Sequence, residues 1–292
     1  LRQFAELVGG RGCVVRHGRM AYAWGDISRR GDVASAAKPV YAHFIINAVE
    51  QGLIESFDAP VQALEPRLAA LNSDLGHKDR EITWRHMAHQ TSCYGVAERP
   101  GEAFNYNDYH MALLVDTLFN GAYGVSLDSV DQAVLQPLLT DVLQCQDSPT
   151  LLAFGPEDRP GRLAISPRDF ARFGLLYLRD GVVDGARLLP ADWVQGARAP
   201  QPGVDDEGWG YGRHWWTLPS MPGAFFANGH GGQFVFLVLF AYAFFFEGYT
   251  GLTITIGAIV TLAVMMQLTG RVNWEEALAP NSAPPPPLPP GG

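Results

Sequence analysis

The segment Gly31-Asp-Val-Ala-Ser-Ala-Ala-Lys-Pro-Val40 places a serine and a lysine three residues apart, at Ser35 and Lys38. Residues at this spacing lie on the same face of a helical turn, so the hydroxyl and the amine can meet. A serine becomes a nucleophile when a neighbouring base takes its proton, and a lysine withdrawn from water can be that base. The alternative is an ordinary helix start with a solvated lysine, because a Ser-x-x-Lys pattern also arises by chance.

Apolar residues at helical spacing follow this pair and predict a helix from Ser35 to Gln51, which Gly52 ends: Val40, Phe44, Ile45, Ala48 and Val49. Pro39 falls in the first turn, where a missing amide hydrogen costs little. We therefore expect Ser35 at the N-terminal end of a buried helix, where free backbone amides favour developing negative charge.

The composition is that of a globular protein, with 292 residues, 47% hydrophobic residues and a net charge of −9. This length accommodates one large domain or two smaller ones. The acidic balance argues against nucleic acid as a partner, because no basic stripe is present to neutralise phosphates. The cysteines Cys13, Cys93 and Cys145 are odd in number and widely spaced, which is typical neither of a disulfide framework nor of a metal site. His86 and His89 have no further ligands at hand, so we expect neither a metal nor an organic cofactor.

Local patterns predict several further elements. Residues 13–24 indicate two strands around a His17-Gly18 turn, and a helix is expected from His110 to about Phe119. Ser166 is a candidate N-cap of an amphipathic helix that ends near Leu178. The aromatic segment 208–216 is typical of a sheet strand. Its large side chains either pack in the core, which is more usual, or line an acyl pocket: Trp209, Tyr211, Trp215 and Trp216.

Two more stretches carry groups that could serve Ser35. Tyr106-Asn-Asp108 lies in a polar loop and offers a phenol and a carboxylate. A tyrosine near a lysine ammonium has its phenolate favoured, so Tyr106 could share in general-base work. In Asn228-Gly-His-Gly-Gly-Gln233, the glycines let a substrate approach the backbone, and the amide that follows can point at an oxyanion.

Taken in order, Ser35-Ala-Ala-Lys38, Tyr106-Asn-Asp108 and His230-Gly-Gly232 resemble the motifs of the serine β-lactamase and penicillin-binding-protein superfamily, most closely its class C-like esterases. Residues 82–92, Pro100-Gly101 and residues 169–174 also resemble family segments, so the likeness extends over about residues 10 to 238. The resemblance implies an α/β (α+β) fold of the β-lactamase/transpeptidase type. In that fold a mostly antiparallel sheet is flanked by helices, and a helical subdomain holds the tyrosine motif.

The resemblance also implies an acyl-transfer site. Ser35 would form an acyl-enzyme, Lys38 would take its proton or balance the charge, and Tyr106 would act as general base and then as acid toward the leaving group. The backbone amides of Ser35 and Gln233 would form the oxyanion hole, with Gly231 and Gly232 beside the substrate. Whether Lys38 or Tyr106 accepts the first proton stays open.

Two departures from the family pattern bear on the substrate. The family's β-lactamases usually have an asparagine where this chain has Asp108, and a carboxylate there would favour the charged form of Lys38 and weaken it as a base. His230 replaces a common lysine and is mostly neutral at pH 7, so it would anchor a substrate carboxylate less well. We therefore expect a small-molecule ester, amide or β-lactam as substrate, with ester or amide cleavage favoured over efficient penicillin hydrolysis. The rival hypothesis is a non-catalytic or weakly active penicillin-binding or membrane-tethered module.

The C-terminal part of the sequence departs further from the family pattern. Phe234 to Phe246 and Leu252 to Leu268 are apolar runs, either helices or buried strands; helices are favoured because seventeen residues exceed an ordinary strand. Residues 252–274 resemble the last membrane helix of inner-membrane stress proteins of the CreD type. If these apolar runs replace the strands that follow the third motif, the hydrolase sheet lacks its last strands.

The domain prediction follows from these patterns. Residues 1–238 would form a β-lactamase-like serine hydrolase domain, residues 239–275 an apolar helical segment that could span a membrane, and residues 276–292 a disordered Pro-rich tail. Membrane association would run through residues 234–268. A place in the cell envelope, periplasmic or membrane-associated, is expected, with the cytoplasm as the alternative.

Overall fold

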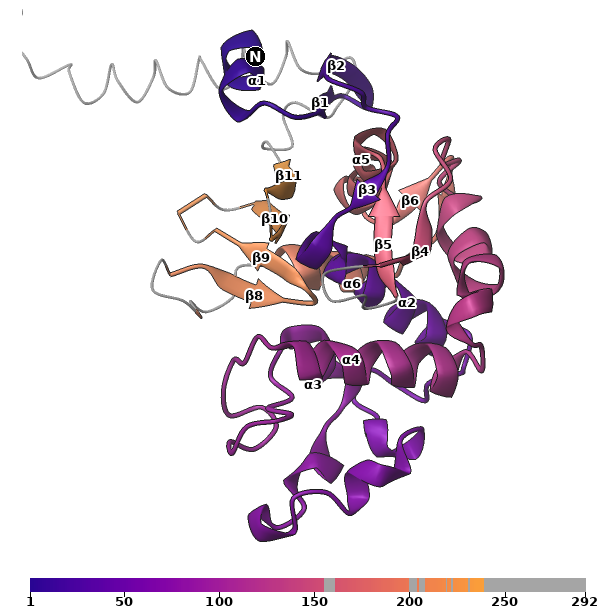
Figure 1. Cartoon of the computed structure of the whole chain (residues 1–292), viewed down its shortest axis with the longest axis vertical. Helices are drawn as coiled ribbons and strands as arrows, with labels where there is room; N and C mark the ends of the chain where they lie inside the picture. The colour runs from indigo at the N-terminus through magenta and orange to yellow at the C-terminus, as the bar shows by residue number, and fades with distance from the viewer. Residues whose placement is uncertain are drawn as a thin grey trace, which may run out of the picture. The chain divides into compact units, whose positions relative to one another are not determined.

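Two antiparallel sheets and the helices around them form the part of the chain that carries the serine motif (Figure 1). The computed structural model describes residues 1–154, 161–199, 204, 208–218, 220–221, 223–230 and 232–238, all within one unit, Leu1–Leu239. The expected mixed α/β fold with antiparallel sheets and flanking helices is confirmed.

The larger sheet has four strands in the order β11-β10-β9-β8. Its strands are β8 (Gly210–Gly212), β9 (Trp215–Thr217), β10 (Ala224–Gly229) and β11 (Gln233–Val238). The aromatic segment is thus two short strands rather than one. Arg213 and His214, with φ angles of 51° and 66°, make the tight turn between them, as expected for a two-residue hairpin.

Strand β11 corrects the prediction for the first apolar run. Val235 and Leu237 are buried while Phe234 and Phe236 are exposed, which is the alternation of a half-buried strand. Residues 234–238 pair with β10 from Phe234↔Asn228 to Val238↔Ala224, so they are not helical. Because every residue of this run is apolar, the sequence does not show which side chains alternate between the buried and the exposed face.

The smaller sheet leads directly into the serine motif. It contains β3 (Gly31–Asp32), β4 (Thr150–Ala153) and β5 (Arg162–Ile165) in the order β3-β5-β4. A 3-10 turn, η1 (Ala34–Ala37), follows β3, and α2 (Lys38–Glu50) continues from it. The helix expected from Ser35 to Gln51 is therefore confirmed, with a tighter first turn that holds the serine.

Helix α5 (Pro167–Leu178) packs against both the large sheet and α2. Ser166 caps it as predicted, since its Oγ accepts a hydrogen bond from the Asp169 amide at 3.1 Å. Phe173 stacks on Trp215 of the sheet with ring centroids 6.2 Å apart and meets the edge of His43 on α2 at 6.0 Å. A Cβ added at Gly174 would stand 2.7 Å from Leu237, so the glycine lets β11 come close.

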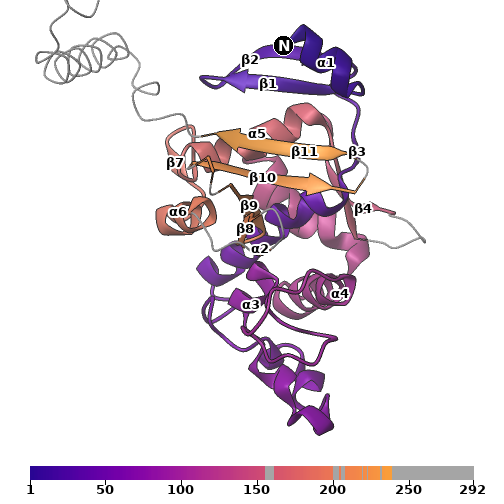
Figure 2. The same cartoon turned by 90° about the vertical axis from the view of Figure 1, so that its left-hand side faces the viewer.

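The N-terminal part is a short helix, α1 (Arg2–Val8), and the predicted hairpin of β1 (Gly12–Arg16) and β2 (Arg19–Trp24). The hairpin contacts α5 and lies beside β11 (Figure 2). Among the described strands, β1 and β2 pair only with each other. The small hairpin of β6 (Val182–Val183) and β7 (Ala186–Arg187) precedes helix α6 (Ala191–Arg198).

Helical segments between α2 and β4 form the subdomain that holds the tyrosine motif. These include α3 (Trp84–His89), α4 (Asp108–Asp116) and the π-helical η6 (Thr117–Ala122) and η8 (Asp131–Thr140). The short 3-10 turns are η2 (Val61–Ala63), η3 (Pro66–Ala69), η4 (Ser73–Leu75), η5 (Lys78–Glu81) and η7 (Leu127–Ser129). Within the described ranges, no helix has the length and apolar character needed to cross a membrane. The segments predicted as a membrane helix (239–275) and a disordered tail (276–292) lie outside those ranges.

Candidate active site

The serine and the lysine of the first motif meet as the spacing predicts. Lys38 Nζ lies 2.8 Å from Ser35 Oγ and donates a hydrogen bond to it. The lysine is only 6% exposed because η1 turns it inward at the start of α2. The nucleophile and its candidate base are therefore in direct contact before any substrate binds.

Burial sets the protonation of Lys38. Loss of water lowers the pKa of its amine to about 7; the charge of Asp108 raises this pKa, and the charge of Arg162 lowers it. The expected influence of Asp108 is present, since its charge favours the charged form of Lys38, but burial has the larger effect and the net pKa is lowered. With such a pKa, roughly half of the amine is neutral at pH 7 and able to accept a proton.

Tyr106 lies beside the lysine, in the loop that precedes α4. Lys38 Nζ is 4.1 Å from the centroid of the Tyr106 ring, and the side chain is 39% exposed. Burial and the charge of Asp108 raise the pKa of Tyr106 to about 12, although a hydrogen bond with Ser35 lowers it. The prediction that a nearby lysine would favour the phenolate is wrong; the phenol stays protonated at neutral pH and suits a donor.

Residues of the tyrosine motif also start helix α4. Asn107 Oδ1 accepts a hydrogen bond from the His110 amide at 2.8 Å and caps the helix. Asp108 is the first helical residue, where a negative charge is favoured by the helix dipole. The cap thus fixes the end of the loop that carries Tyr106, together with Asp108 at the start of α4.

Two buried histidines behind the site were missed by the sequence reasoning. His110 is hydrogen-bonded through Nδ1 to Ser92 Oγ at 2.6 Å and through Nε2 to the Met87 carbonyl oxygen at 2.8 Å. His214 Nδ1 lies 3.1 Å from the Tyr211 hydroxyl. Burial, first of all, lowers the pKa of His110 to about 4 and that of His214 well below its usual value. Both residues are therefore neutral where Lys38 titrates, and no local motif marks them.

The third motif follows β10 directly. His230 is exposed in the turn to β11, Gly231 lies outside the described residues, and Gly232 adopts a φ of 86° that suits glycine. The side-chain Oε1 of Gln233 is buried without a hydrogen-bond partner among the described residues. The roles predicted for His230 and for the Gln233 amide stay predictions.

Gly229, at the end of β10, allows this motif to reach the serine. A Cβ on Gly229 would stand 2.3 Å from the Val33 carbonyl oxygen and 3.2 Å from Ala34 Cβ. Only a residue without a side chain fits at this distance from the backbone of the nucleophile turn.

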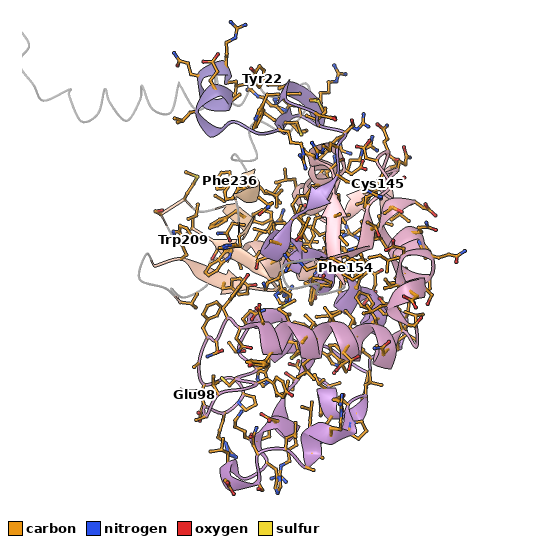
Figure 3. All side chains as sticks on the ribbon, viewed as in Figure 1. Tyr22, Glu98, Cys145, Phe154, Trp209 and Phe236 are labelled. Carbon is orange, nitrogen blue, oxygen red and sulfur yellow. The ribbon has the colours of Figure 1, made fainter. Side chains whose placement is uncertain are left out.

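An aromatic surface continues from Tyr106 across the large sheet. Tyr106 stacks on Trp216 with centroids 6.1 Å apart, and Phe104 meets Trp216 at 5.9 Å. Trp209, which meets Trp216 at 5.9 Å, lies beside the same sheet (Figure 3). Tyr211 and Trp215 are buried core residues, whereas Trp209 and Trp216 are half-buried. Core packing is thus confirmed for Tyr211 and Trp215, while a pocket-lining role of Trp209 and Trp216 stays a prediction.

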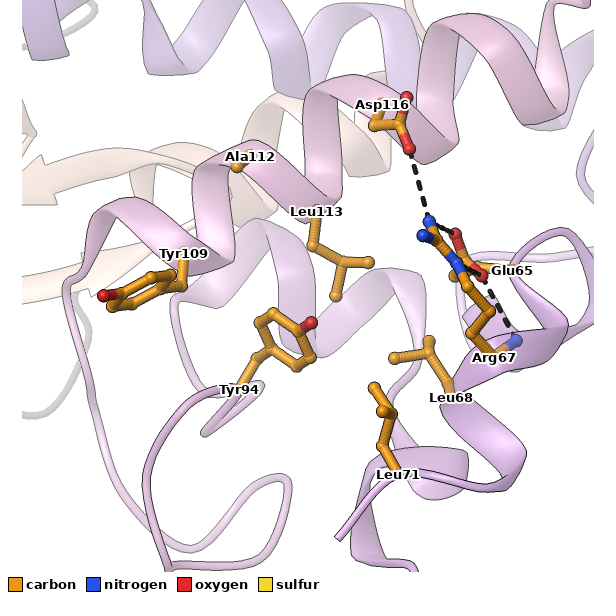
Figure 4. Close-up of a pocket in the computed structure, with 9 residues that line it drawn as sticks. All are labelled: Glu65, Arg67, Leu68, Leu71, Tyr94, Tyr109, Ala112, Leu113 and Asp116. Carbon is orange, nitrogen blue, oxygen red and sulfur yellow. Dashed lines mark hydrogen bonds and ion pairs between the residues drawn. The ribbon is translucent and has the colours of Figure 1, made fainter.

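A separate cavity of about 460 Å³ lies in the helical subdomain (Figure 4). Arg67 reaches into it and pairs with Glu65 and, at 3.7 Å, with Asp116. None of the predicted site residues lines this cavity, so we assign it no part in the chemistry.

The mixed α/β fold and the contact between Ser35 and Lys38 are those expected of a protein with the β-lactamase fold. The chain belongs to the beta-lactamase family, whose family profile matches residues 1–256. No curated protein matches the sequence significantly.

Solved structures share the fold. A candidate beta-lactamase from Bacteroides dorei DSM 17855 is 19% identical, with a TM-score of 0.63 over 81% of this chain and 84% of the other. A candidate 6-aminohexanoate-dimer hydrolase from Bacillus anthracis is 18% identical, with a TM-score of 0.56 over 81% and 72%. The D-alanine carboxypeptidase AmpC from Burkholderia cenocepacia is 14% identical, with a TM-score of 0.56 over 74% and 72%.

Replacing Gly229 with alanine should separate β10 from the nucleophile turn, because the added carbon meets backbone rather than a flexible side chain. We expect a loss of about 1–3 kcal/mol in the free energy of unfolding, measured by urea denaturation. Asn228→Ala, at the exposed neighbouring position, is the control and should change stability little. Equal stabilities of Gly229→Ala and the control would contradict the close approach.

Proposed function

We propose that this protein is a serine hydrolase that forms an acyl-enzyme on Ser35 and cleaves small esters or amides. The observation that supports this most directly is the 2.8 Å contact between Ser35 Oγ and Lys38 Nζ. The lysine is a competent base because burial brings the pKa of its amine to about 7. Lys38, rather than Tyr106, therefore accepts the first proton.

The reaction follows from these protonation states. Neutral Lys38 takes the proton of Ser35, and Oγ bonds to the carbonyl carbon of the substrate. The bond to the leaving group breaks as Tyr106 gives that group its proton, and the Lys38 ammonium then reprotonates Tyr106. In the second half, water gives a proton to Lys38 and its oxygen bonds to the acyl carbon. The ester to Ser35 then breaks, and Lys38 returns the proton to Oγ.

The charges around the site favour a substrate that has no carboxylate beside the scissile bond. His230 replaces the lysine that would bind a substrate carboxylate, and Asp108 adds a negative charge beside Lys38. We therefore propose ester or amide substrates over β-lactams, whose carboxylate needs a cationic anchor. The name of the structural neighbour from Bacillus anthracis, a candidate 6-aminohexanoate-dimer hydrolase, supports the amide option.

The aromatic surface formed by Phe104, Tyr106, Trp209 and Trp216 supports an apolar group on the substrate. Tyr106 is both the proposed acid and part of this surface, so a group that packs on it lies next to the scissile bond. Aromatic faces bind apolar and aryl groups by area burial and stacking. Substrates with longer or aromatic groups should therefore be preferred over acetates.

The acyl-enzyme is tested by covalent labelling of the full chain with a fluorophosphonate. We expect one adduct on Ser35 in the wild type and none in Ser35→Ala, read by intact mass and peptide mapping. Ser129→Ala removes an exposed serine elsewhere and should label like the wild type. An adduct that survives Ser35→Ala, or a folded wild type that does not react, would contradict the proposal.

The influence of Asp108 predicts a pH effect of definite sign. Its charge raises the pKa of Lys38, so Asp108→Asn should lower that pKa and enlarge the neutral fraction at acidic pH. The acidic limb of the labelling rate should move to lower pH by about half to one unit. Asp116→Asn makes the same charge change at the other end of α4 and should leave the limb in place. A shift to higher pH, or an equal shift in both variants, would count against Lys38 as the base.

Shortening Trp216 tests the substrate preference. Trp216→Ala should lower kcat/KM for a p-nitrophenyl hexanoate or phenylacetate about tenfold, because the apolar group loses its stacking surface. The value for p-nitrophenyl acetate should change far less. Trp24→Ala, on the N-terminal hairpin, is the matched control. Equal losses for long and short esters would show that Trp216 supports the fold rather than the substrate.

A further inference from the structure

The carboxylate of Asp32 serves two partners next to the nucleophile turn. Its Oδ1 accepts a hydrogen bond from the Ala34 amide at 2.8 Å. Its Oδ2 accepts hydrogen bonds from Arg162, at 2.9 Å from Nη2 and 3.3 Å from Nε. One side chain on β3 thus links the residue before Ser35 to a cation on β5.

The turn that Asp32 holds is not a relaxed one. Ala34 has a φ of 48°, the left-handed region in which a Cβ is unfavourable. The conformation is kept by the bond to Asp32 and by the bond from the Val33 amide to the Leu163 carbonyl oxygen at 3.1 Å. Both anchors lead to β5, the strand that begins with Arg162.

Arg162 also acts on the base of the site. Its charge lowers the pKa of Lys38, opposite in sign to the effect of Asp108. The other groups that face the amine are Ser35, the protonated Tyr106, and the neutral His110 and His214. Asp108 and Arg162 are thus the two charges that shift the pKa of Lys38, in opposite directions.

We propose that Arg162 is a positioning residue of this active site: it holds the Asp32 carboxylate against the Ala34 amide, which fixes the turn that presents Ser35. The charge of the same arginine also opposes the effect of Asp108 at Lys38. The inference rests on the proposed function, since it concerns the same serine and base. The arginine itself need not touch the substrate. Its 27% exposed side chain is engaged by Asp32.

The experiment measures the second-order rate of fluorophosphonate labelling of the full chain from pH 5 to pH 9. It compares the wild type with Arg162→Met, Arg162→Lys, Asp32→Ala and Asp32→Asn. Arg85→Met is the control, because it removes an exposed ion pair between Arg85, on α3, and Asp58. Thermal melting of each variant reports folding separately.

Removing the cation should raise the pKa of Lys38, so the midpoint of the acidic limb, near 7 in the wild type, should move up in Arg162→Met by about half a unit. Arg162→Lys keeps the charge and should return the midpoint to that of the wild type. Asp32→Ala removes the acceptor of the Ala34 amide and should lower the plateau rate about tenfold. Asp32→Asn keeps an acceptor oxygen and should retain most of that rate.

An unchanged midpoint in Arg162→Met, or an equal shift in Arg162→Lys, overturns the electrostatic part. A wild-type plateau in Asp32→Ala overturns the positioning part. If either of these variants does not fold, Arg162→Gln and Asp32→Val, which also lacks an acceptor for the Ala34 amide, take its place with the same expected directions. A wild type that labels at Ser35 while all these variants match it leaves the proposed function standing and removes this inference. A wild type that does not label removes the proposed function itself.

Discussion

The removal of Lys38 from water is the condition on which the site depends. An exposed lysine would be charged at neutral pH and could not take a proton from Ser35. Burial lowers the pKa of the amine to about 7 against the opposing charge of Asp108. The chain has only one other lysine, Lys78, and that buried residue donates instead to Asp79 at 2.7 Å and to the Cys93 carbonyl oxygen at 2.8 Å. The two buried lysines thus differ in partners: one holds structure together, and the other faces a hydroxyl.

Three segments distant in sequence must converge to achieve this burial. The turn η1 carries Ser35 inward, the capped start of α4 brings Tyr106 over the amine, and β10 closes against η1 at Gly229. Each approach depends on a local feature: a left-handed Ala34, an Asn107 cap and a residue without a side chain. The aromatic surface on the sheet then shields the tyrosine side of the site. The chemistry is therefore a property of the packing of the whole domain rather than of the first motif alone.

Local signals in the sequence were sufficient for part of this picture. The Ser35–Lys38 contact, the helix after it and the Ser166 cap follow from spacing and capping rules that act within a few residues. Strand β11 did not follow, because an unbroken apolar run has no visible period until a partner strand gives it one exposed face. The protonation of Lys38 and Tyr106 could not follow either, since burial is created by segments that are distant in the sequence. The same holds for His110 and His214, which meet only in the fold.

The pairing of Asp32 with Arg162 gives a physical reason why this chain can have an aspartate in its tyrosine motif. The Asp108 carboxylate by itself favours the charged form of Lys38. Arg162, on β5, acts in the opposite direction and lowers the pKa of the same amine, and its guanidinium is held by Asp32. Asp108 and Arg162 therefore have opposite effects on the pKa of one amine. The site retains a neutral base beside Asp108 mainly because Lys38 is buried, and the charge of Arg162 adds to the effect of burial.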